Sequence, residues 1–126
     1  MLNETQYELT YTKCVGAAID TIWQILNPSH NSWTGFKSLG LEDFLKRREA
    51  FLWVIERLLK EGSIKLHKNG MLIESPIEEQ IEAFKRALPI SINDSGYEDF
   101  YWWFFDPECP AGIAWRREDG SYEIAD

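Results

Sequence analysis

Hydrophobic residues recur along the chain at two periods, and these periods separate the expected helices from the expected strands. Spacings of three and four residues predict helices over residues 4–14, 17–26, 41–61 and 76–88. The range 41–61 carries the broadest apolar stripe, which is typical of a central helix that buries one face against its neighbours.

A β-hairpin is predicted over residues 63–74, directly after this central helix. Its turn falls at Asn69-Gly70, a pair that strongly favours a two-residue type I′ turn because both positions need positive φ. A two-residue loop there places Lys68 opposite Met71 and thereby sets the register of the whole hairpin.

A second hairpin is predicted over residues 113–124, with its turn at Asp119-Gly120. A two-residue loop at this pair places Arg116 opposite Glu123, so that a cation and an anion face each other across the strands. We expect this hairpin and the first one to contribute to the same small sheet.

Six consecutive aromatic residues, 100–105, form the most unusual stretch of the chain. We interpret residues 97–105 as a strand, in which alternate side chains face opposite sides. Both sides are then apolar, so either the strand is central and buried on both faces, or one face or a flanking loop is an interaction surface. The predicted fold class is α+β, with about four helices packed on a small, mostly antiparallel sheet that contains two β-hairpins.

The length of 126 residues predicts a single domain, 1–126, whose core needs neither disulfides nor a metal. No apolar run is long enough to span a bilayer and the start lacks a secretory pattern, so we expect a cytoplasmic protein without a membrane partner. Cys14 and Cys109 are far apart, and we expect two buried free thiols. No metal-ligand spacing or phosphate-binding glycine motif is present, so neither a metal nor a cofactor is predicted.

Negative charge is concentrated in the last third of the chain. Residues 1–88 hold 12 acids and 11 bases, whereas residues 89–126 hold 9 acids and 2 bases. The net charge of −8 therefore arises mostly beside the aromatic stretch. Phosphate backbones repel such a surface, so nucleic acid is excluded as a partner, whereas a basic protein is attracted to it.

Residue types that could support catalysis are present without a recognisable arrangement. Acids near Trp102 and Trp103 offer the components of a glycosidase, but pairs of acids occur by chance in an acidic chain. Neither cysteine lies in a nucleophile motif, and the carboxylate that precedes Cys109 disfavours a thiolate. We therefore assign no catalytic residue and expect a protein that is not an enzyme, with a small carboxylate-dependent hydrolase as the less favoured alternative.

Three stretches of the sequence resemble a family of small bacterial proteins of unknown function. They read "KRREAFLWVIERLLKEGSIKLHKNG", "SPIEEQIEAFKRALP" and "FYWWFFDPECPAGIAWRREDGS". The resemblance covers about residues 40–120 and is weaker over the first 40 residues. It implies no established activity and no catalytic residue. Small acidic bacterial proteins of this kind are often similar to immunity proteins, which neutralise a toxin domain from the same system.

These observations favour a binding protein, most concretely an immunity protein that occludes the substrate site of a basic toxin domain. The expected contact residues are acids and aromatic residues of the last third: Glu98, Asp99, Trp102, Trp103, Asp106 and Glu108. The acids would supply charge complementarity, and Trp102 or Trp103 would be the apolar anchor. The alternative is a structural or regulatory homodimer that is joined through the aromatic strand.

Overall fold

The computed structural model describes residues 1–28, 39–96 and 100–125. This part of the chain contains four α-helices and one four-stranded antiparallel sheet, which confirms the α+β fold class. The elements are, in chain order, α1 (Glu4–Cys14), α2 (Ile19–Ile25), α3 (Phe44–Lys60), β1 (Ile64–Lys68), β2 (Met71–Leu72), α4 (Ile77–Ala87), the 3₁₀ helices η2 (Asn93–Ser95) and η3 (Phe100–Phe105), β3 (Gly112–Arg116) and β4 (Tyr122–Ala125).

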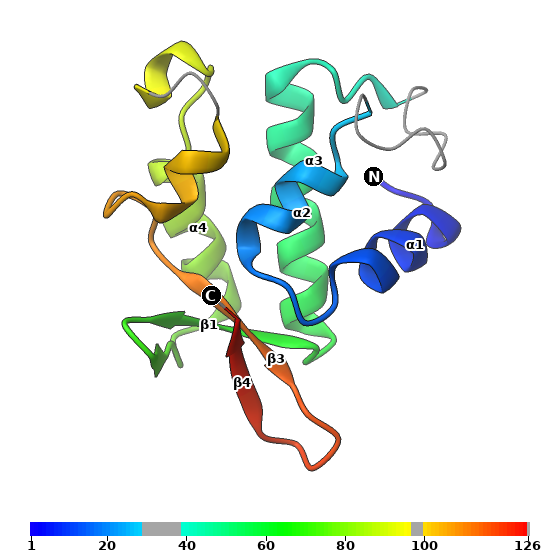
Figure 1. The fold of residues 1–126 in the computed structure, drawn as a ribbon, viewed down its shortest axis with the longest axis vertical. Coiled ribbons are helices and arrows are strands. Elements are labelled where there is room, and N and C mark those ends of the chain that lie inside the picture. The colour runs from blue at the N-terminus through cyan, green and yellow to red at the C-terminus, as the bar shows by residue number, and fades with distance from the viewer. Residues whose placement is uncertain (29–38, 97–99, 126) are drawn as a thin grey trace.

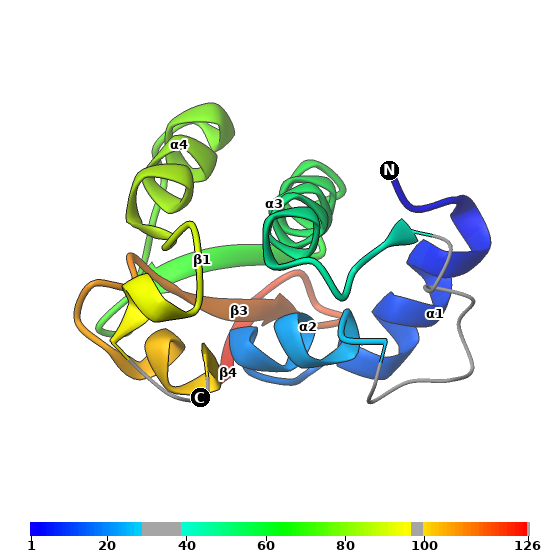
Figure 2. The ribbon, with the colours of Figure 1, turned by 90° about the horizontal axis from the view of Figure 1, so that it is seen from above.

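The four strands follow the order β2-β1-β3-β4, and each neighbouring pair is antiparallel. In Figure 1 the helices lie together above the sheet, and the β3–β4 hairpin projects away from them. From above, α3 and α4 run side by side along one edge of the molecule, while α2 and η3 lie along the opposite edge (Figure 2). The core occupies the space between these two rows of helices.

Helix α3 is the centre of this core, as its apolar stripe predicts. Phe51, Ile55 and Leu58 recur at helical spacing, and their side chains are fully buried. Burial of one such side chain contributes about 1.5–3 kcal/mol to the free energy of unfolding. The predicted helix was longer, since α3 begins at Phe44 and ends at Lys60.

The first hairpin has the predicted register. Asn69 and Gly70 have φ angles of 53° and 84°, as a type I′ turn requires. Lys68 pairs with Met71, so the two-residue loop at this turn is confirmed.

The second hairpin forms, but its predicted register is wrong by one residue. Arg116 pairs with Tyr122 instead of Glu123. The reason is the loop, which contains the three residues 118–120 and has Gly120 in the left-handed region at φ 88°. An Asp-Gly pair suits such a three-residue loop as well as a two-residue one.

The aromatic stretch is not a strand, which corrects the prediction for residues 97–105. Residues 100–105 form the 3₁₀ helix η3, and residues 97–99 lie outside the described chain. Helix η3 packs on α2 through aromatic rings, since the ring centroids of Trp23 and Phe100 are 4.6 Å apart. Phe44 of α3 joins this cluster at 4.9 Å from Phe100. The stretch therefore fills the space between two helices instead of extending the sheet.

Strand β3 also joins the sheet to the first two helices. The Trp115 indole N–H donates a hydrogen bond of 2.7 Å to the carbonyl oxygen of Ala17, in the link between α1 and α2. The Trp115 ring also meets the ring of Tyr11 in α1, at a centroid distance of 6.0 Å. These contacts fix α1 against the end of the sheet.

Candidate binding site

Helix η3 has a buried face and an exposed face, and each carries an aromatic pair. Phe100 and Trp103 are buried and stack at a centroid distance of 5.5 Å with an interplanar angle of 7°. Trp102 and Phe105 are each 56% exposed, and their centroids are 6.1 Å apart. Both pairs have the spacing i, i+3, which a 3₁₀ helix places on one side because it has three residues per turn.

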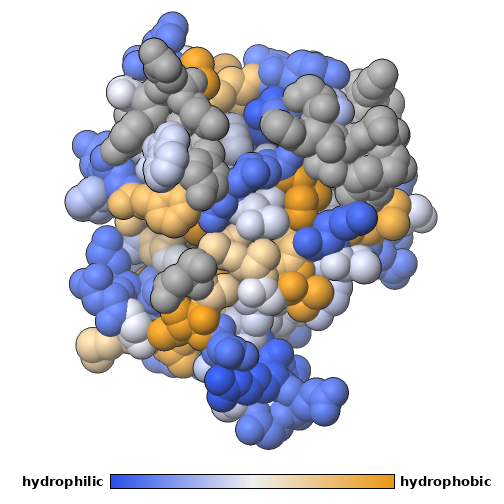
Figure 3. All heavy atoms as spheres, in the orientation of Figure 1, coloured by the Kyte–Doolittle hydropathy of each residue, from blue (hydrophilic) through white to orange (hydrophobic). Residues whose placement is uncertain are grey.

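The turn that follows η3 adds acidic groups beside the exposed pair. The Glu108 backbone N–H donates to Asp106 Oδ1 at 2.9 Å, and the Asp106 N–H donates to the Trp103 carbonyl oxygen at 3.0 Å. Glu108 is exposed and Asp106 is half-buried. Apolar side chains gather on this face where η3 and the end of β4 lie, while hydrophilic side chains cover the β3–β4 turn (Figure 3).

The structure separates the predicted contact residues into three groups. Trp102 is exposed on η3, and Asp106 and Glu108 lie in the turn that follows it, so a role of these three residues in binding stays a prediction. Trp103 is 0% exposed, so its assignment as a surface anchor is wrong. Its place in the i, i+3 stack with Phe100 explains this burial. The predicted residues Glu98 and Asp99 lie outside the described residues.

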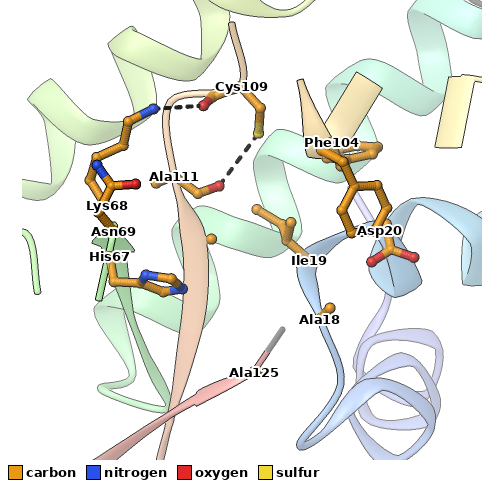
Figure 4. A pocket seen from close by; sticks show the side chains of 12 residues that line it. Ala18, Ile19, Asp20, His67, Lys68, Asn69, Phe104, Cys109, Ala111 and Ala125 are labelled. Carbon is orange, nitrogen blue, oxygen red and sulfur yellow. Dashed lines mark hydrogen bonds between the residues drawn. The ribbon is translucent and has the colours of Figure 1, made fainter. Parts of the chain in front are cut away.

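A pocket of about 340 Å³ opens next to the exposed aromatic pair. Phe105 belongs to both, because it lines the pocket as well as contributing to the exposed face of η3. Figure 4 shows Asp20 and Phe104 on one side of this pocket and His67, Lys68 and Asn69 on the other. The residues that line it are Ala18, Ile19, Asp20, His67, Lys68, Asn69, Phe104, Phe105, Cys109, Ala111, Gly112 and Ala125.

Of the described residues that line this pocket, Asp20 alone carries a carboxylate. This residue is only 6% exposed. Its Oδ2 accepts a hydrogen bond of 2.9 Å from the Gln24 side-chain amide, one turn further along α2. Burial raises the pKa of the Asp20 carboxyl, and the hydrogen bonds from its own backbone and from Gln24 oppose that rise. A hydrolase with paired carboxylates would need a second acid here, and neither Asp106 nor Glu108 lines the pocket.

His67 lies on the opposite wall and is held in one tautomer. The Gly70 backbone N–H donates to His67 Nδ1 at 3.3 Å, so in the neutral imidazole the hydrogen is on Nε2. Nε2 is buried without a hydrogen-bond partner in the described part of the chain. It lies against Gly112 of β3, where a Cβ would be only 2.7 Å away. Position 112 therefore requires glycine, because the imidazole ring of His67, its cross-strand neighbour, occupies the space of a Cβ.

Both cysteines are buried and free, as the sequence predicts. Burial raises the pKa of the Cys14 thiol to about 12 and that of the Cys109 thiol to about 11. The Cys109 thiol donates to the Ala111 carbonyl oxygen at 3.4 Å, and Lys68 Nζ donates to the Cys109 carbonyl oxygen at 3.3 Å. Both sulfurs are thus neutral at physiological pH and behave as packing groups. The described residues contain no group of three His, Cys, Asp or Glu side chains that could hold a metal.

Three residues of this site were not predicted from the sequence. Asp20 had a signal, because it precedes Trp23 by three residues and so lies near the apolar face of its helix. Phe105 was placed on a strand face with Trp103, and the 3₁₀ spacing separates the two. His67 had no local signal, since its burial depends on Gly112, which is distant in sequence.

The fold and the pocket define a small α+β protein, and comparison with known sequences gives its family. The chain belongs to the family described as "Protein of unknown function, DUF596", whose sequence profile matches residues 59–124. The matched range begins in the last turn of α3 and includes strands β1 to β3, η3 with the turn after it, and β4 except for its last residue, Ala125. The predicted resemblance to a family of proteins of unknown function is thereby confirmed.

A solved structure has the same fold. It is an "Uncharacterized Protein Conserved in Bacteria" from Neisseria meningitidis, with 24% sequence identity and a TM-score of 0.72. The alignment covers 93% of this chain and 84% of that one, so the similarity extends to α1 and α2. No curated protein matches the chain. No helix in the described ranges has the length and apolar character needed to cross a membrane.

Proposed function

We propose that this chain is a cytoplasmic immunity protein that binds a basic toxin domain and occludes its substrate site. In this proposal it acts by binding and not by catalysis. The partner contacts the exposed face of η3 and the acidic turn after it, which we call the η3 surface (Trp102, Phe105, Asp106 and Glu108).

The observation that carries this proposal is the exposure of Trp102 and Phe105 on a helix that buries Phe100, Trp103 and Phe104. Large aromatic side chains dominate the binding energy of many protein interfaces, because their burial removes extensive apolar area from water. A pair of them next to acidic groups matches the arrangement of an apolar anchor with a polar rim.

Charge supports a basic partner over a second copy of this chain. Residues 89–126 hold 9 acids and 2 bases, so two copies of the η3 surface would repel each other when placed together. A basic domain is instead attracted and approaches faster at low ionic strength. We therefore expect the association rate to fall as salt concentration rises.

The direct test is to express the protein with toxin domains encoded next to its gene. We expect one such domain to arrest growth when expressed alone and to be neutralised when this chain is co-expressed. The purified pair should form a complex with micromolar or tighter affinity. If no neighbouring domain is neutralised and none binds, the proposal is wrong.

A pair of variants tests whether the η3 surface is the interface. Trp102→Ala should abolish neutralisation, whereas Val15→Ala should leave it unchanged. Val15 is a suitable control because it is also apolar, about half exposed, and lies at the end of α1. Equal neutralisation by both variants would place the interface elsewhere on the molecule.

The exposed aromatic pair also keeps the homodimer as a second candidate. In a homodimer Trp102 would pack against the partner's η3, and the acidic groups would have to lie at the edge of the contact. Sedimentation at several protein concentrations distinguishes the two. A mass of twice that of the chain, lost in Trp102→Ala, would favour the homodimer.

A further inference from the structure

The pocket beside η3 contains a buried carboxylate, Asp20, whose hydrogen bonds come from uncharged groups. Asp20 is 6% exposed, and the groups that act on it are its own backbone and the Gln24 amide. A buried carboxylate that lacks a cation is held at a cost in free energy, because neutral hydrogen bonds replace only part of its hydration. A cation that enters the pocket would therefore gain more from Asp20 than from an exposed acid.

The walls of the pocket suit a long aliphatic stem. Phe105 of the η3 surface lines the pocket. Ile19, Phe104 and Ala18 line the side that carries Asp20 (Figure 4). These groups are apolar and provide a surface for methylene groups. Phe105 of the proposed interface and the Asp20 carboxylate therefore line one pocket together with these apolar groups.

The charges at the two sides of the pocket determine at which end a cation binds. Lys68 is on the side opposite Asp20, where its ammonium group donates to the Cys109 carbonyl oxygen (Figure 4). A second cation is repelled at that end and attracted at the Asp20 end. His67 does not serve as an anchor, because its unpaired Nε2 is covered by Gly112.

We propose that the pocket receives an arginine side chain of the protein partner, with its guanidinium group on the Asp20 carboxylate. This inference rests on the proposed function, since it assumes a basic partner at the η3 surface. Arginine fits better than lysine because its planar guanidinium can bind a carboxylate with two hydrogen bonds and can stack on aromatic rings such as Phe104 or Phe105. Its weaker hydration also lowers the cost of leaving water.

The size of the pocket agrees with a single side chain. Its volume of about 340 Å³ is at the lower end of the range of about 300–1,000 Å³ for ligand pockets. It therefore accommodates one arginine and leaves the rest of the partner to cover the η3 surface. The arginine would be a central contact of the interface, enclosed by the aromatic pair.

The pocket can be tested without knowledge of the partner. The probe is Nα-acetyl-L-arginine amide, and the matched control is Nα-acetyl-L-citrulline amide, which has nearly the same shape and no charge. Each is titrated into the ¹⁵N-labelled full chain while the amide resonances are followed. We expect the arginine probe to shift resonances of residues 18–20 and 104–112, and to bind at least about tenfold more tightly than citrulline.

Two variants complete this experiment. Asp20→Asn keeps the size of the side chain and should weaken the arginine probe to the level of citrulline. Ala18→Leu fills the pocket without a change of charge and should block both probes. The inference is overturned if arginine and citrulline act equally, if arginine binds Asp20→Asn as well as the wild type, or if the shifts occur only near Asp106 and Glu108.

The partner experiment separates this inference from the proposed function. If a toxin domain binds the wild type, Asp20→Asn should weaken the complex at least about tenfold, and Trp102→Ala should weaken it as well. A complex that loses affinity in Trp102→Ala but not in Asp20→Asn supports the proposed function and overturns the arginine inference. If no partner binds, the proposed function fails, and the probe titration still decides whether the pocket binds arginine.

Discussion

The two faces of η3 carry similar aromatic pairs, of which one is buried in the core and the other is exposed. Phe100 and Trp103 stack on each other in the core, whereas Trp102 and Phe105 are more than half exposed. Both pairs consist of one Phe and one Trp at spacing i, i+3, so their chemistry is nearly the same. Position on the helix therefore decides which pair stabilises the fold and which is available to a partner.

This difference indicates that one short helix can carry residues for stability on one face and residues for binding on the other. Substitutions on the buried face should change the free energy of unfolding, and substitutions on the exposed face should change the affinity for a partner. The predictions below test that separation.

The largest effect is expected for Trp103→Ala. This side chain is fully buried against Phe100 and Phe104, so its removal leaves a cavity that the neighbouring rings cannot fill. We expect the free energy of unfolding to fall by about 3–5 kcal/mol, measured by urea denaturation. A loss similar to that of an exposed residue would show that η3 is not part of the core.

Trp102→Ala should give the opposite result. Its free energy of unfolding should stay within about 0.5 kcal/mol of the wild type, because the side chain is largely in water. The affinity for the partner should fall by at least about 2 kcal/mol, as measured by calorimetry. A stability loss comparable to that of Trp103→Ala would remove the distinction between the two faces.

Gly112→Ala tests a buried contact outside η3. The added methyl group would lie 2.7 Å from His67 Nε2, and we expect a loss of about 1–3 kcal/mol in the free energy of unfolding. The double variant Gly112→Ala with His67→Ala should recover part of that loss, because the clash is gone. Additive losses would show that the two residues do not interact.

The smallest effect is expected for Asp20→Asn in the free protein. Because burial raises the pKa of Asp20, the folded state binds this proton more tightly than the unfolded state does. Ionisation of Asp20 therefore lowers the free energy of unfolding. This loss disappears as the pH falls through the raised pKa of the folded state towards the ordinary pKa of the unfolded state. At neutral pH the variant should be as stable as the wild type or more so, with the difference shrinking in acid. A variant that is less stable at neutral pH would contradict this.

The two hairpins show how far turn residues predict register. At Asn69-Gly70 both residues need positive φ, and only the two-residue loop satisfies both. At Asp119-Gly120 only Gly120 is left-handed, so a three-residue loop forms and the register moves by one. The second pair of residues is compatible with both loops, and the sequence alone does not choose between them.

The aromatic stretch could not be assigned by hydrophobic pattern, because six aromatic residues in a row have no period. Their positions follow from α2 and α3, whose Trp23 and Phe44 receive Phe100. Part of the candidate site was predictable, namely its negative charge and the exposure of Trp102. The pocket was not, since it requires β1, β3, α2 and η3 to be brought together.

The hydrogen bond from Trp115 to the Ala17 carbonyl also has a consequence for the order of folding. It joins residues separated by 98 positions, so most of the chain must be arranged before it can form. Contacts of such long range have a high loop-closure entropy and tend to slow folding. We expect α3 with the β1–β2 hairpin to form early from local contacts. Helix α1 would then dock last, when β3 has taken its place and offers the indole ring.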